Sequence, residues 1–573
     1  MKIALIKQRG FAWQSDAKHH CKGYATDNNG SYLDASGLQA LIKDKKPKAL
    51  SDILTDLNGC FCLVSEDADT IFAAVDRVRS FPLFYAIDDQ GDLLLSDDAF
   101  DLKDRLLPET IDNDSVSEFL LTGYVCGADT IYSQIRQLLA GEYLVFNKNT
   151  KTLKLNIYYR YIHPEESKLG KAGLLDAMHD MHKGMAQRLI QSLNGRPVAI
   201  PLSGGYDSRL IASLLKEAGY DNIVCFSYGD PKSAEVLISK AAADHLKLPW
   251  RFAAHDRESW FAAYQSSLRK DFYRYATHLS ASAHIQDWLA VKDLKAKALL
   301  PDDSIFIPGH SGDFLEGSHL PLTFENVPRV SRYALIQAIL NRHFRLWDWK
   351  DHYHRYYPVF REKLCQSLDI PAFMNPEQAA SLFEEWDLRE RQAKFINNSV
   401  RVYEFFGSEW RLCLWDNAML DFWASVPLRH RMGRKLFLDY AQSRLNMPVP
   451  VYTGRSLSRR VFDKVLRCGF GNLTDSRYGR FLDYSHKLSY LRSQIASLCR
   501  EDLEYPLFIR KKSLLLRADI NAIQALMALK EWKGGSRGSE MRDENGEWRI
   551  ENGELRMENG EWRIENGEWR IEN

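Results

Sequence analysis

Residues 201–208 read PLSGGYDS and directly follow an apolar run at 198–200. Glycine and serine between a buried strand and a helix start let backbone N–H groups approach an anion, which the helix dipole also favours. The loop lacks the lysine of a Walker A sequence, so Asp207 could serve a polyphosphate only through a divalent metal. The alternative is an ordinary strand-to-helix turn. The candidate nucleotide-binding residues are Leu202, Ser203, Gly204, Gly205, Asp207 and Ser208.

Three segments of the second half resemble a known family. SGGYDS at 203–208 resembles the SGGxDS pyrophosphate-binding motif of the ATP-pyrophosphatase group, whose members cleave ATP between the α and β phosphates. SIFIPGHSGDFLEGSH at 304–319 looks like the second signature of asparagine synthetases, SGEGSDExFGGY. EWRLCLWD at 409–416 is similar to the family's ExRxPFLD, with Cys413 where proline is usual. The matching residues are Gly309, Asp313, Gly317, Glu409, Arg411 and Asp416.

Two N-terminal segments agree with this resemblance. Residues 57–86 are similar to the family's LNGxFAF and ARDRxGxxPLYY stretches, and residues 118–146 to its interdomain stretch. The chain therefore resembles the glutamine-hydrolysing asparagine synthetases over roughly residues 1–530. The implied fold class is α/β: an N-terminal Ntn-hydrolase-like antiparallel β-sandwich with helices, then an ATP-pyrophosphatase (adenine nucleotide α-hydrolase-like) parallel sheet with a large helical C-terminal part.

The resemblance also implies a reaction, in which an AMP-forming ligase uses ATP and Mg²⁺ to activate a carboxylate as its adenylate and passes the acyl group to nitrogen. Asp207 and Asp313 would carry Mg²⁺. Gly309 and Tyr228 would lie at the nucleotide, with plain packing as the alternative for Tyr228. Aspartate is the acid that the family name implies. The alternatives are amidation or cyclisation of another carboxylate in glycan or natural-product biosynthesis, and a catalytically silent nucleotide-binding homologue.

Two residues replace expected catalytic groups. His310 stands where the family has a glutamate; histidine can act as a base near neutral pH but cannot attract ammonium by negative charge. This exchange favours an organic amine or a different acceptor over free ammonium, with a structural hydrogen bond as the alternative role of His310. The family's late lysine, which neutralises phosphate charge, has no counterpart in residues 446–462. Arg455 is the candidate replacement, with a basic surface helix as the alternative.

The N-terminus also departs from the family. Members that use glutamine begin, once Met is removed, with a cysteine whose thiol attacks the amide. This sequence begins Met-Lys-Ile, and its first cysteine is Cys21. We expect a degenerate amidotransferase domain that does not hydrolyse glutamine. The alternative is an upstream start or a truncated chain.

Hydrophobic patterns predict the elements that position these residues. An antiparallel sheet is expected from four strand-like runs at 60–65, 71–75, 83–87 and 93–96. A helix from about residue 115 and a hairpin turning at 147–149 follow. Past about residue 170, helices alternate with apolar strands, which predicts a parallel sheet covered on both faces.

Three domains are expected. Residues 1–160 form a degenerate class II glutamine amidotransferase-like domain with a connecting segment, and residues 161–533 an asparagine-synthetase-like ATP-pyrophosphatase domain. Residues 534–573 form a tail of NGEWRIE-type repeats. Because an Asn-Gly turn interrupts the tail every seven residues, we expect a disordered or loosely β-prone segment rather than a coiled coil.

Composition limits the partners. The 76 Lys and Arg residues balance the 76 Asp and Glu residues, so neither nucleic acid nor a membrane surface is expected as a partner. The nine cysteines form no CxxC pair, and no signal peptide or membrane-spanning run is recognised. We expect a cytoplasmic protein that binds a small-molecule carboxylate and a nitrogen donor, with a homodimer as a candidate assembly.

Overall fold

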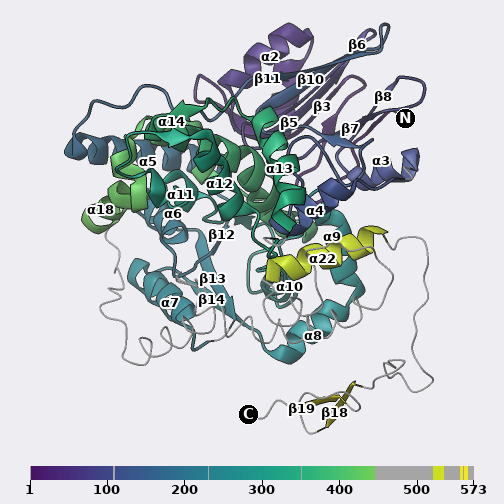
Figure 1. Ribbon diagram of the computed structural model, residues 1–573. Helices are drawn as coiled ribbons and strands as arrows, with labels where there is room; N and C mark the ends of the chain where they lie inside the picture. The colour runs from purple at the N-terminus through teal and green to yellow at the C-terminus, as the bar shows by residue number, and fades with distance from the viewer. Residues whose placement is uncertain are drawn as a thin grey trace. The chain divides into compact units, whose positions relative to one another are not determined.

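The computed structural model describes residues 2–107, 110–229, 231–349, 352–445, 520–533, 555–558 and 561–564. It divides into two compact units, Met1–Ala528 and Leu529–Asn573. Within the first unit, two sheets come from the N-terminal part of the chain, and a parallel sheet with most of the helices comes from the part that follows (Figure 1).

The larger N-terminal sheet has seven strands in the order β11-β10-β6-β5-β3-β2, with β4 paired to β3, and every pair is antiparallel. Its strands are β2 (Gln14–Ser15), β3 (His19–Thr26), β4 (Tyr32–Leu33), β5 (Asn58–Glu66), β6 (Thr70–Val75), β10 (Glu142–Asn147) and β11 (Thr152–Ile157).

The smaller sheet has the order β1-β8-β7-β9, and its one parallel pair is β1 with β8. Its strands are β1 (Ile3–Ala4), β7 (Phe84–Ile87), β8 (Leu93–Ser96) and β9 (Arg136–Gln137). The predicted antiparallel architecture is confirmed, and β5 to β8 coincide with the four expected runs within two residues.

Strand β5 shows why this half is so well buried. Successive side chains of a strand point to opposite faces. Phe61 and Leu63 pack into a core with α1 (Ala35–Ile42) and α2 (Pro47–Asp56), while Cys60 and Cys62 belong to the opposite face. All four are at most 2% exposed, so both faces of the strand are covered. The helices that follow are α3 (Ala99–Leu106) and α4 (Asn113–Thr122).

The parallel sheet has the order β14-β13-β12-β15. Its strands are β12 (Val198–Pro201), β13 (Ile223–Gly229), β14 (Trp250–Ala254) and β15 (Ile305–Phe306). From β12 the chain moves first to one side and later to the other, so strand order reverses between β12 and β15. In open α/β sheets, ligands bind at such a reversal, outside the carboxyl ends of the strands.

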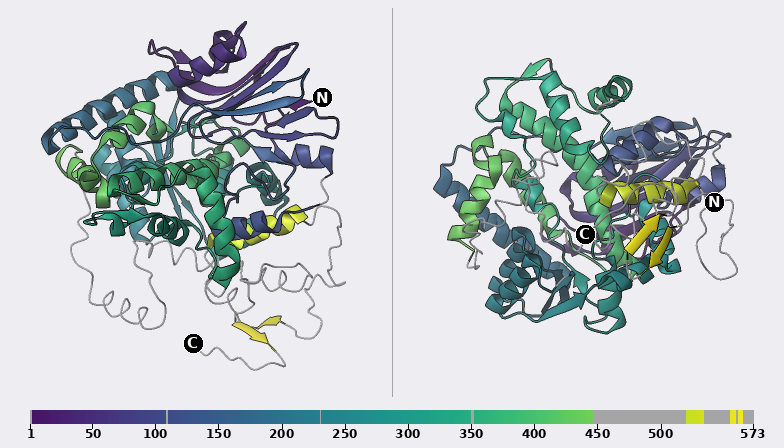
Figure 2. Two further views of the ribbon diagram at one scale, coloured as in Figure 1. Left: turned by 45° about the horizontal axis from the view of Figure 1, so that its top comes forward. Right: turned by 60° about the horizontal axis from the view of Figure 1, so that its bottom comes forward.

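Helices connect and surround these strands, as the apolar pattern predicted (Figure 2). The first half of the set is α5 (Lys171–Leu193), α6 (Tyr206–Glu217), α7 (Ala234–Leu246), α8 (Arg257–Gln265), α9 (Ser267–Thr277) and α10 (Trp288–Ala296). The second half begins with α11 (Gly312–Leu315), η1 (Leu322–Phe324), α12 (Arg332–His343), α13 (Tyr353–Ser367) and α14 (Pro376–Asp387), with β16 (Val330–Ser331) and β17 (Phe373–Met374) between them.

The chain then forms a π-helix, η3 (Leu388–Ile396). It continues through η4 (Asn397–Val400), α15 (Arg401–Phe405), η5 (Cys413–Trp415), α16 (Asn417–Ser425), α17 (Leu428–Arg431), η6 (Met432–Arg434) and α18 (Lys435–Ser443). The predicted α/β class, with a parallel sheet followed by a large helical part, is confirmed.

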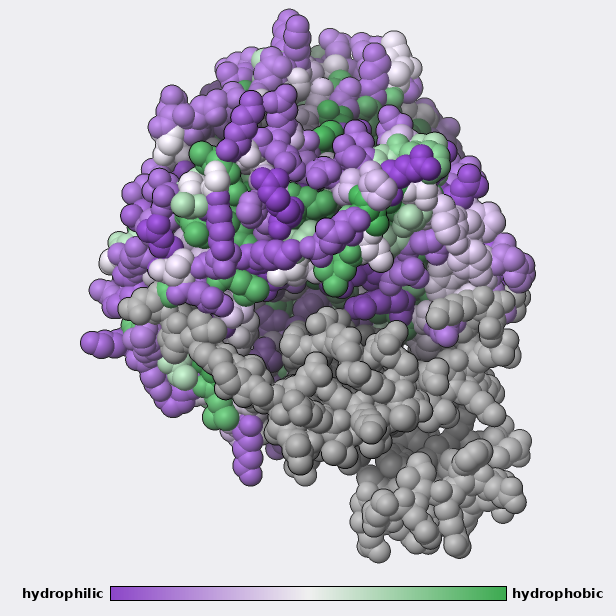
Figure 3. Space-filling model, turned by 60° about the vertical axis from the view of Figure 1, so that its left-hand side comes forward, coloured by the Kyte–Doolittle hydropathy of each residue, from purple (hydrophilic) through white to green (hydrophobic). Residues whose placement is uncertain are grey.

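The last described elements of the chain are a helix and two short strands. Helix α22 (Ile520–Lys533) crosses from the first unit into the second, and in the second unit β18 (Leu555–Glu558) pairs antiparallel with β19 (Glu561–Ile564). The predicted domain limits and the disorder of the tail stay predictions. The face shown in Figure 3 is mainly hydrophilic, with scattered hydrophobic residues. Among the described residues, no helix is both long and apolar enough to cross a bilayer.

Candidate active site

The first glycine loop joins β12 to α6. Leu202 is buried and its N–H donates to the Phe226 carbonyl at 2.8 Å. The Ser203 N–H donates to Ser208 Oγ at 3.1 Å, so the loop closes onto the first turn of the helix. Gly205 begins α6 without a side-chain cap. The helix start is therefore open to an external anion.

Arg209 organises the other side of this loop. The Arg209 Nε donates to the Gly205 carbonyl at 2.9 Å, and Nη2 donates to the Gly204 carbonyl at 3.2 Å. Arg209 as a whole is only 2% exposed. Two loop carbonyls are thereby occupied, and the Gly205 N–H donates to Ser203 Oγ at 3.1 Å, so the first turn of α6 is the part of this segment that suits an anion.

The second glycine loop follows β15 and packs directly on the first. A Cβ at Gly309 would lie 2.5 Å from the Ser208 nitrogen, and one at Gly312 would lie 2.8 Å from the Asp207 carboxyl carbon. Only glycine permits this approach. The Asp313 N–H, in the first turn of α11, donates to Asp207 Oδ2 at 3.0 Å. The two predicted metal-binding aspartates thus lie together at the reversal of strand order.

Arg434 balances the first aspartate. Its Nη2 contacts Asp207 Oδ1 at 3.0 Å and also pairs with Glu316. Burial raises the pKa of Asp207 to about 6, with Arg434 opposing the shift and Asp313 adding to it. Burial likewise raises the pKa of Glu316 well above its usual range, again opposed by Arg434. One guanidinium therefore serves two buried carboxyl groups.

A buried histidine orients the second aspartate. His319 Nδ1 lies 2.5 Å from Asp387 Oδ2, and its Nε2 lies 3.4 Å from Asp313 Oδ2. Burial lowers the pKa of His319, but the charges of Asp387 and Asp313 outweigh burial and raise it overall. Burial would raise the pKa of Asp313, yet the hydrogen bond and charge of His319 hold it below its usual range. Asp313 is therefore ionised at neutral pH.

The site fits Mg²⁺ by the chemistry of its donors. Mg²⁺ prefers oxygen ligands and is commonly held by one or two carboxylates together with substrate phosphates. Asp207 and Asp313 supply the carboxylates, and the open start of α6 lies beside them. In the part of the chain that the structure describes, no group of three or more His, Cys, Asp or Glu side chains surrounds a metal position. The phosphates would complete the shell.

His310 lies on the second loop beside η4. Its Nδ1 and Nε2 lie 3.0 and 3.3 Å from Ser399 Oγ, which donates its own proton to the Ile396 carbonyl at 2.6 Å. A hydroxyl has one proton to give, so the imidazole must donate to Ser399, and its other nitrogen is left as an acceptor. Burial lowers the pKa of His310 to about 4, although Asp313 opposes the shift.

Two basic residues near His310 and Asp313 were not identified from the sequence. His284 has a buried Nδ1 without a hydrogen-bond partner among the described residues, and burial, then the charge of His310, lowers its pKa to about 3. Arg391 of η3 is half-buried, and its charge helps lower the pKa values of Asp313 and His284. Within the described ranges Arg391 makes no hydrogen bond or ion pair.

The remaining predicted residues separate into three cases. Tyr228 is the last residue but one of β13, so it lies near the carboxyl edge of the sheet, as expected; its ring centroid is 6.0 Å from that of His255. Arg455 falls outside the described residues. Asp416 caps α16, forms a bidentate pair with Arg188 at 2.7 and 2.8 Å and accepts from Asn58, which is a structural role.

The other motif residues and the N-terminal thiols are structural as well. Arg411 is 2% exposed and donates to Ser192 and Glu409. Burial raises the pKa of Cys60 to about 12 and raises those of Cys21 and Cys62 further. These thiols lie in β3 and β5 and are poor nucleophiles.

The missed site residues are Arg209, His284, Glu316, His319, Asp387, Arg391 and Arg434. Glu316 and His319 lie inside the quoted signature, and their charge was an available signal. Asp387, Arg391 and Arg434 come from distant helices, and no spacing on the chain marks them.

Comparisons with known proteins agree with this division of the chain. Residues 27–159 match the family described as glutamine amidotransferase domain, and residues 188–466 match the family described as asparagine synthase. No curated protein is matched.

Two solved structures are similar in part. The "allosteric regulatory enzyme of purine biosynthesis" shares 13% identity, over 43% of this chain and 47% of that protein, with a TM-score of 0.17. Glutamine phosphoribosylpyrophosphate amidotransferase from B. subtilis, complexed with ADP and GMP, shares 12% identity, over 53% of this chain and 64% of that protein, with a TM-score of 0.18. Each match spans less than two thirds of the solved protein, and TM-scores this low do not establish a shared overall fold.

The family assignment therefore rests on the two family matches. They cover more than two thirds of the sequence, in the order amidotransferase then synthase. Such domains belong to ATP-dependent amidotransferases or ligases in general. The chain belongs to the asparagine synthetase family.

Proposed function

We propose that the protein activates a carboxylate with ATP as an acyl-adenylate, releases pyrophosphate, and transfers the acyl group to nitrogen with release of AMP. The observation that carries this proposal is the contact between Asp207 and Asp313, where two glycine loops meet at the reversal of strand order. Both acidic groups stand beside an open helix start, which is the combination that a metal-bound polyphosphate requires.

In the first step, a substrate carboxylate oxygen attacks the α-phosphorus, and the bond to the β-phosphate oxygen breaks with pyrophosphate leaving. The loop at Ser203, Gly204 and Gly205 would hold the pyrophosphate at the start of α6, which has no side-chain cap. Mg²⁺, when bound at Asp207 and Asp313, would supply charge neutralisation for the leaving group.

Arg391 supports an acid with a second carboxylate. It is a half-buried cation near Asp313 and His284 without an ion-pair partner among the described residues. A guanidinium binds carboxylate in a bidentate fashion. Aspartate, which the family name suggests, carries both the carboxylate to be activated and one for Arg391, so aspartate is the proposed acid.

In the second step, the nitrogen attacks the acyl carbon and AMP leaves with the bonding electrons. Attack first gives a tetrahedral intermediate, and its nitrogen must lose a proton before or as AMP departs. His310 holds an acceptor nitrogen and is neutral at pH 7, so we propose that it receives this proton. Its depressed pKa makes it a weak base, which suits an amine that has already become acidic by forming the tetrahedral intermediate.

We further propose that ammonium or an organic amine, rather than glutamine, supplies the nitrogen. Cys21, Cys60 and Cys62 are buried in strands, and burial raises the pKa of each. The Cys126 thiol is also buried with a raised pKa. None of these four could attack an amide without opening a sheet or the connecting segment.

The test is pyrophosphate release from ATP, Mg²⁺ and aspartate, with ammonium and separately with glutamine. We expect release with ammonium, formation of asparagine and AMP in equal amounts, and no stimulation by glutamine. Release with glutamine would overturn the proposed nitrogen donor. No release with any nitrogen donor would overturn aspartate, and the assay would pass to other carboxylates; failure there too would leave a silent nucleotide-binding homologue.

A further inference from the structure

A second cavity lies away from the ATP site. Its volume is about 560 Å³, within the range of small-molecule sites. One wall comes from the connecting segment of the N-terminal half, around Cys126–Asp129 in sequence, and the other from α13, the end of α14 and η3. Neither Asp207, Asp313 nor His310 lines it.

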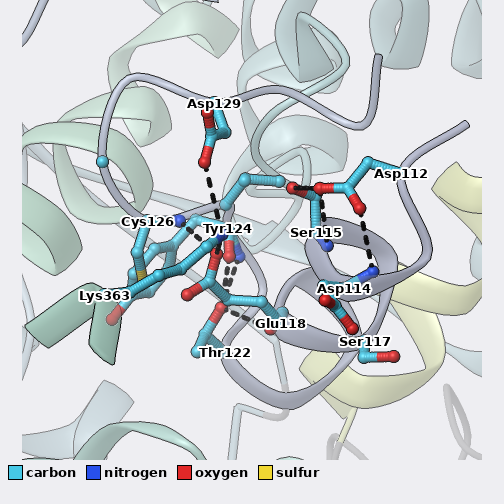
Figure 4. Close-up of polar contacts among 12 residues, drawn as sticks. Asp112, Asp114, Ser115, Ser117, Glu118, Thr122, Tyr124, Cys126, Asp129 and Lys363 are labelled. Atoms are coloured by element: carbon cyan, nitrogen blue, oxygen red, sulfur yellow. Dashed lines mark hydrogen bonds and ion pairs between the residues drawn. The ribbon is translucent and has the colours of Figure 1, made fainter. Parts of the chain in front are cut away.

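Lys363 ties the two walls together. Its Nζ lies 3.1 Å from Glu118 Oε2 and 3.3 Å from Asp129 Oδ2 (Figure 4). The Cys126 N–H also donates to Glu118 Oε2 at 2.9 Å. Burial lowers the pKa of Lys363, but Glu118 and Asp129 outweigh burial and raise it overall. One oxygen of Glu118 is therefore fully used by the protein.

The other carboxylate oxygen of Glu118 has no hydrogen-bond partner in the described structure. Glu118 is 1% exposed, and its Oε1 is buried without a hydrogen-bond partner in the described structure. A buried carboxylate oxygen without a donor is costly, and such atoms are rare in folded proteins. An ammonium group of a ligand in the cavity would satisfy it.

Arg389 is a buried cation that lacks a hydrogen-bond acceptor in the described structure. This η3 residue is 7% exposed, and its Nε is buried without a partner. Throughout the described ranges the Arg389 guanidinium makes no hydrogen bond or ion pair. Its charge acts on Glu142 only at longer range, where it opposes the rise in the pKa of Glu142. Burying a charge without a paired partner is strongly unfavourable. A carboxylate fits the guanidinium in a bidentate manner.

The rest of the lining selects the ligand further. Cationic and acidic side chains line the cavity in equal number, so a ligand with a net charge would be disfavoured. Phe344, Phe360 and Trp386 form an aromatic part of the wall, with ring centroids 4.8 Å apart for Phe344 and Phe360 and 6.2 Å for Phe344 and Trp386. This surface suits an apolar side chain.

We propose that this cavity binds a zwitterionic amino acid with a large apolar side chain, its carboxylate on Arg389, its ammonium on Glu118 and its side chain on the aromatic wall. This site is distinct from the proposed ligase site and does not depend on the proposed reaction. It joins both halves of the chain, because Glu118 lies in the amidotransferase match and Arg389 in the synthase match.

The test is isothermal titration of the full chain with three probes that differ by one group. L-phenylalanine carries both charges, 3-phenylpropionate lacks the ammonium and 2-phenylethylamine lacks the carboxylate. We expect saturable binding of L-phenylalanine and at least tenfold weaker binding of the other two. Equal binding of all three, or no binding of L-phenylalanine, would overturn the proposal.

Variants locate the binding. Arg389→Gln should weaken L-phenylalanine binding at least tenfold, whereas Arg251→Gln, on the exposed surface of β14, should leave it unchanged. Asp207→Asn should also leave it unchanged, which separates this site from the ligase site. If Arg389→Gln does not fold, Glu118→Gln provides the same comparison, because it removes a charge from the site and keeps the size of the side chain. Unchanged binding in a folded Arg389 or Glu118 variant would overturn the assignment.

Discussion

The two halves of the chain place their chemically capable residues differently. In the N-terminal half, Cys21, Cys60 and Cys62 lie within strands whose two faces are both covered. In the synthase half, Ser203, Asp207 and Asp313 lie just beyond strand ends, on loops and first helical turns. A residue inside a doubly covered strand can only pack, whereas a residue past its carboxyl end can meet a ligand. Position on the element, more than residue type, therefore underlies our prediction that the synthase half carries the reaction.

The largest effect should come from removing the charge at the junction of the two loops. Asp207→Asn keeps the shape of the side chain but loses the carboxylate that would hold Mg²⁺ and pair with Arg434. We expect pyrophosphate release to fall on the order of 10²-fold to 10³-fold, the scale of losing one electrostatic group at a reacting centre. Asp244→Asn, in an exposed pair on α7, is the matched control and should keep full activity.

Next comes the close approach of the loops. A methyl group at Gly309 would lie 2.5 Å from the Ser208 nitrogen, so Gly309→Ala must push the two loops apart. We expect at least a tenfold loss of pyrophosphate release and a loss of about 1–3 kcal/mol in the free energy of unfolding, measured by denaturant titration. Gly170→Ala has open space around it and should change neither. An active, fully stable Gly309→Ala would disprove the packing.

The pH dependence should be smaller and one-sided. Burial raises the pKa of Asp207 to about 6, so its metal-binding, ionised form is lost as the pH falls through that value. We expect pyrophosphate release at limiting Mg²⁺ to drop about tenfold from pH 7 to pH 5. Higher Mg²⁺ should move the midpoint to lower pH, because the metal favours the ionised form. His310, with a pKa of about 4, should add no second limb between pH 5 and pH 8. A rate independent of pH would contradict this account.

The N-terminal half should show the smallest effect. Iodoacetamide on the native protein should label Cys365, which is exposed, and leave Cys21, Cys60 and Cys62 unlabelled. Peptide mass spectrometry locates the label, and the same reagent after unfolding is the control. Labelling of Cys60 in the native state at neutral pH would contradict the claim that the thiols of the N-terminal strands are inaccessible.

Sequence patterns predicted the local part of this structure well. The four N-terminal strands and the strand-loop-helix at 198–217 follow from apolar runs and glycines. The family resemblance assigned Asp207 and Asp313 to one site, which agrees with their contact in the structure. The partners of the aspartates could not be predicted. Arg434 begins α18 with a left-handed φ of 63°, and Asp387 ends α14, so each reaches the site only because helices far apart in sequence pack there. The parallel pairing of β1 with β8 likewise depends on long-range packing.

The links between the halves carry a further consequence. The Asn397 side chain donates to the Val78 carbonyl, Lys394 donates to the carbonyls of Val125 and Gly127, and Asp416 accepts from Asn58. These are buried or half-buried contacts, and each would be left unsatisfied if the halves separated. We therefore expect one cooperative calorimetric transition for both halves, and a truncation that removes residues 1–160 should yield an insoluble synthase half. The N-terminal half would then be needed for the synthase half to fold, apart from any reaction that it catalyses.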